Sequence, residues 1–218
     1  MSDTPIDVFI DLPSFPGPVQ AGRLWSHFRK GRESASFEYN KEWLANPHRF
    51  ALEPLLPLAD GTFHTNPGQS VFGAIGDSTP DRWGRILMRR AELARARTAN
   101  ESPHTLSELD YLLRVNDEAR QGALRFSQDG GQSFCAPPGS TPIPPLVNLS
   151  RLLHAADHFC RDDENAEDLR LLLAPGSSLG GARPKASVKD KKGNLCIAKF
   201  PRYDDEYNVV AWEAVALT

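Results

Sequence analysis

Cysteine is scarce in this chain of 218 residues, which contains only Cys135, Cys160 and Cys196, widely spaced and without a CxxC pair. That number and spacing suggest neither a disulfide framework nor a zinc site, and a reducing cytoplasm is the expected location. No apolar run approaches the roughly 20 residues of a membrane helix, and no basic leader precedes an apolar segment at the amino terminus. We therefore expect a cytoplasmic protein without a membrane partner.

A surplus of charge of either sign is also missing. The 28 acidic and 25 basic residues give a formal net charge of -3. This balance provides no electrostatic reason to expect nucleic acid as a direct partner. Any link to DNA would have to come through another protein.

Two kinds of periodicity predict the fold. Segments that alternate apolar and polar residues like half-buried strands lie at 6–12, 22–28, 34–39 and 122–126. Helical patterns or compositions lie at 80–90, 105–113, 146–160, 165–173 and 207–217, with Ser78 or Thr79 expected near the cap of the first helix and Pro80 in its first turn. The stretch 127–145 is rich in proline and glycine and is predicted to be a linker. The sequence thus predicts an α+β protein with a small-sheet subdomain and helices over 1–145 and a second domain over 146–218.

The stretch SSLGGARPK at 177–185 is the most specific local pattern. Adjacent Gly180 and Gly181 permit positive φ and close approach of a ligand, so that backbone N–H groups can converge on phosphate oxygens. A hairpin is predicted directly after it, from strands at 186–189 and 195–200 with Gly193 at the bend. A plain turn is the competing interpretation, and no GK[ST] follows at the spacing of a Walker A loop.

Lys199 and Glu213 strengthen the phosphate interpretation. Lys199 ends an apolar strand after the glycines, and Glu213 follows on a predicted helix. In kinase-like lobes, a strand lysine that reaches the phosphates is oriented by a helix carboxylate. Taken alone, either residue would be read as an ordinary solvated side chain.

Several motifs together resemble a known family. SLGGARPK (178–185), IAKFP (197–201) and the helix that carries Glu213 are similar to the nucleotide-binding lobe of HipA-type serine/threonine kinases, the toxin components of bacterial toxin–antitoxin pairs. FGAIGDSTPDRWGR (72–85), LDYLL (109–113) and GALRF (122–126) are similar to motifs of the amino-terminal part of that family. The resemblance covers nearly all of the chain, and it implies that 146–218 is a partial kinase N-lobe.

The resemblance implies roles for individual residues. The ATP phosphates would be lined by Gly180, Gly181, Ala182, Arg183, Pro184 and Lys185. Lys199 would contact the α and β phosphates, and Glu213 would position Lys199. Ser178 would be an autophosphorylation site whose added negative charge expels the loop, with Ser177 as an alternative acceptor. A serine here could equally be only a hydrogen-bonding loop residue.

The activity that the resemblance implies is phosphorylation of a protein serine or threonine with ATP and Mg²⁺. In the family the phosphorylated protein is an aminoacyl-tRNA synthetase. The implied partner is a helix-turn-helix antitoxin, and DNA would be bound only through it. No catalytic loop or metal-binding aspartate is recognisable up to Thr218. We therefore expect the C-terminal lobe to be absent, with no catalytic residue in this chain and Mg²⁺ bound through the missing lobe. The alternative is a truncated, non-catalytic module, or a split-kinase subunit, that binds an antitoxin or regulates a catalytic chain.

Two other groups of polar residues are expected to be solvated. His154 and His158 lie four residues apart on a predicted helix, but no acidic or cysteine partner lies at ligand spacing, so we expect no metal site there. The acidic run 204–206 is expected to be a solvated loop or the start of a helix.

Overall fold

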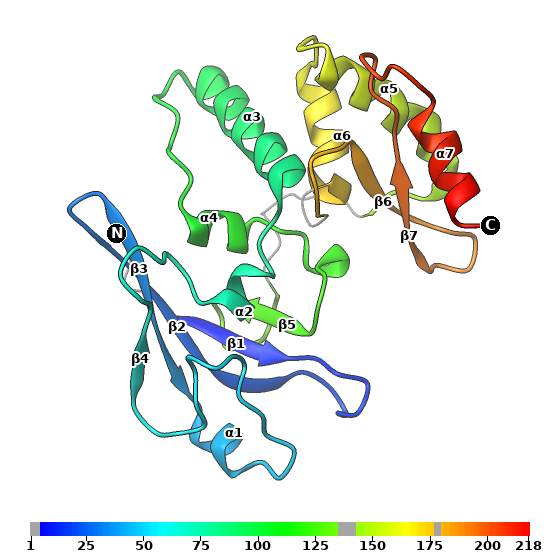
Figure 1. The fold of residues 1–218 in the computed structure, drawn as a ribbon. Coiled ribbons are helices and arrows are strands. Elements are labelled where there is room, and N and C mark those ends of the chain that lie inside the picture. Colours follow the sequence, from blue (N-terminus) through cyan, green and yellow to red (C-terminus); the bar gives the residue numbers. More distant parts are fainter. Residues whose placement is uncertain (1–4, 135–142, 177–179) are drawn as a thin grey trace. The chain divides into compact units, whose positions relative to one another are not determined.

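A computed structural model of the chain describes residues 5–134, 143–176 and 180–218, and it divides into two compact units (Figure 1). The described part of the first unit comprises 5–79, 106–117 and 121–134, and that of the second comprises 80–105, 118–120, 143–176 and 180–218. The second unit thus includes residues 80–105, which precede position 145. The division into family domains at residue 145 stays a prediction.

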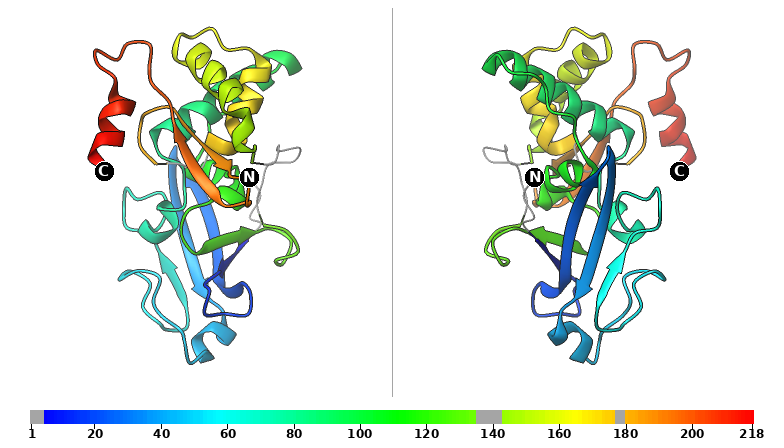
Figure 2. Two further views of the ribbon diagram at one scale, coloured as in Figure 1. Left: turned by 90° about the vertical axis from the view of Figure 1, so that its right-hand side faces the viewer. Right: turned by 90° about the vertical axis from the view of Figure 1, so that its left-hand side faces the viewer.

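The first unit is built on a five-stranded antiparallel sheet in the order β4-β3-β2-β1-β5. Its strands are β1 (Ile6–Ile10), β2 (Val19–Arg29), β3 (Arg32–Tyr39), β4 (Thr62–His64) and β5 (Leu124–Ser127). Lys30 and Gly31 form the two-residue turn between β2 and β3, with φ of 51° and 77°. Positive φ at both turn positions matches the twist of the flanking strands, which run side by side in Figure 2.

Short helices pack on this sheet and complete its core. They are α1 (Lys41–Ala45), α2 (Gly73–Gly76) and α4 (Glu108–Leu113). A 3-10 turn, η1 (Asp117–Ala119), follows α4 in the sequence and runs into residues 118–120 of the second unit. Trp43 of α1, Ile75 of α2 and Leu112 of α4 are fully buried together with strand residues such as Phe37 and Phe126. The expected mixed α+β fold is confirmed.

The second unit gathers helices around a two-stranded antiparallel sheet. Its elements are α3 (Arg82–Ala99), η2 (Leu146–Asn148), α5 (Leu149–Cys160), α6 (Ala166–Gly176), β6 (Lys185–Lys189), β7 (Leu195–Lys199) and α7 (Val209–Ala216). Trp83 and Leu87 of α3 share a buried cluster with Phe159 of α5, Leu172 of α6 and Val188 of β6. By contrast α7 has no buried residue, and Figure 2 shows it, in red, apart from α5 and α6.

The start of α3 differs from the prediction. The helix begins at Arg82 with Asp81 at the N-cap, and Pro80 therefore precedes it instead of lying in its first turn. Thr79 and Ser78 lie two and three residues before this N-cap, near the cap as expected but not at it. Of the helices in the described ranges, none is both long enough and apolar enough to cross a membrane.

Candidate functional site

The β6–β7 hairpin brings two lysines together. The register pairs Lys185 with Lys199 at the end of the hairpin next to the Gly-rich loop, and Gly193 lies in the connecting turn with a φ of 85°. Directly opposed residues on antiparallel strands project to the same face of the sheet. The hairpin thus concentrates positive charge beside the loop, as phosphate binding requires.

Lys199 and Glu213 form the contact that the sequence predicts. The Lys199 ammonium makes an ion pair with Glu213 Oε1 of α7, although the side chains remain 50% and 37% exposed. Asn208 caps α7, because its side chain accepts a hydrogen bond of 2.9 Å from the Ala211 N–H. An exposed pair of this kind adds little stability, so its interest lies in where it holds the lysine.

The Gly-rich loop is held by the start of α3. Gly181 has a φ of 80°, its N–H donates to Asp81 Oδ2 at 2.7 Å, and its carbonyl accepts from the Trp83 N–H at 3.0 Å. The Lys185 ammonium donates to the Gly180 carbonyl. The backbone of Gly181 is therefore bonded on both sides to residues about 100 positions earlier in the chain.

Both ends of the loop rest against Trp83. Its indole N–H donates to the Lys185 carbonyl at 2.9 Å, and its ring meets Phe159 edge to face with centroids 5.1 Å apart. On the other end, a Cβ at Gly176 would lie 2.6 Å from a Leu87 methyl and 3.1 Å from Trp83 Nε1. Gly176, at the end of α6, and Lys185, at the start of β6, therefore both lie against one buried tryptophan.

Burial and hydrogen bonds shift the pKa of Lys185 and of Asp205 beside the loop. Burial lowers the pKa of Lys185, the nearby Lys199 lowers it further, and Asp81 opposes the shift. Arg183 donates to Asp205, and this hydrogen bond, with one from the Arg202 N–H, lowers the pKa of the Asp205 carboxyl. The expectation that the 204–206 run is only a solvated loop is therefore wrong for Asp205, which holds a residue of the Gly-rich stretch.

The remaining predicted residues are placed as follows. Gly181 and Ala182 are exposed, whereas Pro184 is buried and its carbonyl accepts from the Phe200 N–H at 2.9 Å. Ser178 and the alternative acceptor Ser177 lie outside the described residues.

Sequence reasoning missed Asp81, Trp83 and Asp205, which contact the loop from distant positions. Asp81, directly before the first residue of α3, is evident in the sequence. No pattern in the residues around it indicates a contact with Gly181.

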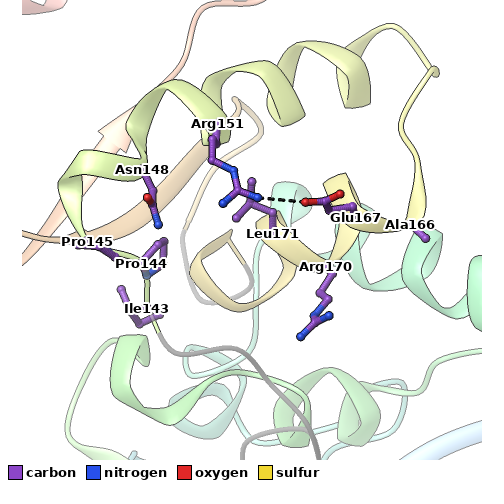
Figure 3. Close-up of a pocket in the computed structure, with 9 residues that line it drawn as sticks. All are labelled: Ile143, Pro144, Pro145, Asn148, Arg151, Ala166, Glu167, Arg170 and Leu171. Atoms are coloured by element: carbon purple, nitrogen blue, oxygen red, sulfur yellow. Dashed lines mark hydrogen bonds and ion pairs between the residues drawn. The ribbon is translucent and has the colours of Figure 1, made fainter.

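A cavity of about 620 Å³ lies elsewhere in the second unit, between the starts of α5 and α6 (Figure 3). Arg151 and Glu167 form an ion pair of 3.0 Å there, and Arg170 points away from it. Among the described residues lining this cavity, none belongs to the predicted phosphate site.

The described part of the chain contains no group of three or more histidine, cysteine, aspartate or glutamate residues able to hold a metal ion. His158 instead makes a 3.0 Å contact with Asp168.

Comparison with known protein families gives a match over the first part of the chain. The family described as HipA N-terminal domain matches residues 17–127, just over half of the chain. The matched range contains the five-stranded sheet except β1, together with α1 to α4. No curated protein matches the chain significantly.

Proposed function

Because the chain belongs to the HipA family, we propose that the Gly-rich loop and the β6–β7 hairpin form the nucleotide-binding part of a HipA-type serine/threonine protein kinase. The observation that carries this proposal is the ion pair between Lys199 and Glu213 beside that loop. A strand lysine held by a helix carboxylate next to a glycine loop is the arrangement that positions ATP phosphates in protein kinases. Here the three parts lie within one compact unit.

Each part would have a separate role. The loop over 180–185 would cover the phosphates, and Lys199 would contact the α and β phosphates while Glu213 keeps its ammonium in place. Lys185, which burial makes easier to deprotonate, adds a second positive charge on the same face. Mg²⁺ would be held by a segment that carries the metal-binding aspartate, since it needs carboxylate oxygens near the β and γ phosphates.

The partners follow from the family and are part of the proposal. The phosphate acceptor would be a serine or threonine of a protein in translation, for which the family precedent is an aminoacyl-tRNA synthetase. A small helix-turn-helix antitoxin would bind the protein and carry it to operator DNA. The net charge of -3 supports indirect binding, because the chain offers no charge surplus for the DNA backbone.

Ser178 is proposed as the residue that switches the site off. Phosphorylation adds a charge of about −1.5 to −2, and at this position it would repel the nucleotide phosphates from the loop. Phosphate on Ser178, found by mass spectrometry after incubation of the active enzyme with ATP, would support this role. Its persistent absence would contradict it.

The kinase proposal is tested by substitution of Lys199 in the protein encoded by the complete reading frame. We expect Lys199→Ala to lower phosphate transfer from ATP by about 100-fold or more, because a charge that stabilises the transferred phosphate is lost. Lys192→Ala is the matched control, since Lys192 is an exposed lysine in the turn of the same hairpin. Full activity of the Lys199→Ala protein would refute the assignment.

A second candidate, a non-catalytic binding module, is favoured by the surface of α7. Trp212 and Val215 of α7 are each 62% exposed, and Leu217, directly after the helix, is 83% exposed. Apolar groups gathered in this way mark surfaces that bind another segment or another protein. A reading frame that continues past Thr218 into a catalytic aspartate, an asparagine and a later metal-binding aspartate would support the kinase, and a stop codon there would support the module.

A further inference from the structure

We propose that Asp81 is a positioning residue for the Gly-rich loop, whose carboxylate fixes the loop in the conformation that receives nucleotide phosphates. This inference rests on the proposed function, since the loop needs a fixed conformation only if it binds a ligand. It also gives residues 80–85, at the start of α3, a function beyond helix initiation.

The geometry at Gly181 is the first argument. Asp81 Oδ2 lies 2.7 Å from the Gly181 nitrogen and 3.3 Å from the position of a Cβ at Gly180. The Trp83 N–H bonds the Gly181 carbonyl from the other side at 3.0 Å. Two residues of one turn thus hold both polar groups of a single glycine, which restricts its φ and ψ.

The position of Asp81 on α3 is the second argument. An aspartate at an N-cap ordinarily accepts a hydrogen bond from a backbone N–H of its own first turn. Asp81 has the extended backbone of an N-cap, with φ of -77° and ψ of -170°, yet its side chain makes no such capping bond. The carboxylate that would cap the helix binds the Gly-rich loop instead.

This contact changes the role expected for Gly181. Its N–H is already satisfied by a carboxylate, so a phosphate oxygen would have to displace Asp81 to reach it. We infer that Gly181 shapes the loop and that phosphate contacts come from neighbouring groups, including the Lys199 ammonium. The Lys185 ammonium, bonded to the Gly180 carbonyl, holds the loop from its other end.

Hydrogen exchange in the whole chain tests the anchor without any nucleotide. We expect Asp81→Ala to speed exchange of the Gly181 amide, followed by NMR, about tenfold, which corresponds to the loss of one hydrogen bond. Asp81→Asn keeps an acceptor oxygen and should restore most of the protection. Asp190→Ala is the matched control, because half-buried Asp190 also accepts 2.8 Å bonds, from the Lys192 and Asn194 N–H groups at the far end of the hairpin. The Asp190→Ala substitution should leave the exchange rate of the Gly181 amide unchanged.

ATP affinity, measured on the same proteins by NMR titration, tests the link to function. Asp81→Ala should raise the Kd for ATP about threefold to tenfold, whereas the Asp81→Asn and Asp190→Ala proteins should stay within about twofold of wild type. Absence of ATP binding to the wild-type chain would overturn the proposed function. Intact wild-type binding with unchanged affinity in Asp81→Ala, or unchanged exchange at Gly181, would overturn the role of Asp81 alone.

Discussion

Replacement of Trp83 by phenylalanine is the most informative perturbation of the loop support. Trp83 is 3% exposed, and its indole N–H bonds the Lys185 carbonyl at the start of β6. Phenylalanine keeps an aromatic ring for the edge-to-face contact with Phe159, but it removes the N–H donor and several buried atoms. The substitution therefore separates loop support from simple aromatic packing.

The expected loss of stability follows from these two changes. A lost hydrogen bond costs about 1 kcal/mol, and more where the carbonyl is shielded from water. The smaller ring leaves a space beside Gly176 and Leu87, which costs about 1–2 kcal/mol in lost burial. We expect Trp83→Phe to lower the free energy of unfolding of the second unit by about 2–3 kcal/mol.

Urea unfolding followed by far-UV circular dichroism measures this loss. Trp212→Phe is the matched control, because Trp212 lies in the same unit and is 62% exposed. It should change the free energy of unfolding by less than about 0.5 kcal/mol. Unfolding of both the Trp83→Phe and the Trp212→Phe protein at the same urea concentration as wild type would refute the support of the loop by Trp83.

Two further predictions concern packing and pH. Gly22→Ala would place a Cβ 2.2 Å from the Glu38 carbonyl oxygen, whereas a Cβ at Gly17 meets nothing within 4 Å. We expect Gly22→Ala to destabilise the first unit by about 3 kcal/mol in thermal unfolding. Gly17→Ala should change the stability of that unit little. Equal effects of the two substitutions would contradict the close approach of β2 to β3. The hydrogen bond with Asp168 raises the pKa of His158 above its ordinary value of 6.5, so the pair stabilises fully below that value and loses its effect as the pH rises through the raised pKa. His158→Gln should therefore lower the melting temperature more at about pH 5.5 than at about pH 8.5, and an equal loss at both would contradict the ion pair.

Local patterns predicted both hairpins and the helices α3 to α7, although α3 continues to Ala99 and α2 was not predicted. Alternating side chains and turn residues such as Gly31 and Gly193 act over a few positions, and both hairpins form where they were expected. Pro80 was expected in the first turn of α3, but the helix begins at Arg82. The Asp81 carboxylate at its N-cap bonds Gly181, which lies about 100 residues away in the sequence. A contact between two distant residues produces no periodic pattern of side chains in the sequence around either of them.

In the candidate site, too, contacts between neighbouring elements were predicted and contacts between distant segments were not. The contact between Lys199 and Glu213 forms as expected, since strand and helix are separated only by a short connection. The contacts of Asp205 with Arg183 and of Trp83 with Lys185 depend on how distant segments pack, which a single sequence does not encode locally. The phosphate-binding roles themselves stay predictions.

Titration of the isotopically labelled chain with ATP, in the presence of Mg²⁺ and followed by NMR, tests the central claim most directly. We predict chemical-shift changes concentrated on the amides of 180–183 and 185 and of residues around Lys199, with a Kd of the order of 1 mM. AMP should bind more weakly, since a loop that recognises phosphates gains affinity from each one. No shift up to about ten times that concentration, or shifts confined to residues outside the loop and hairpin, would contradict a nucleotide site here.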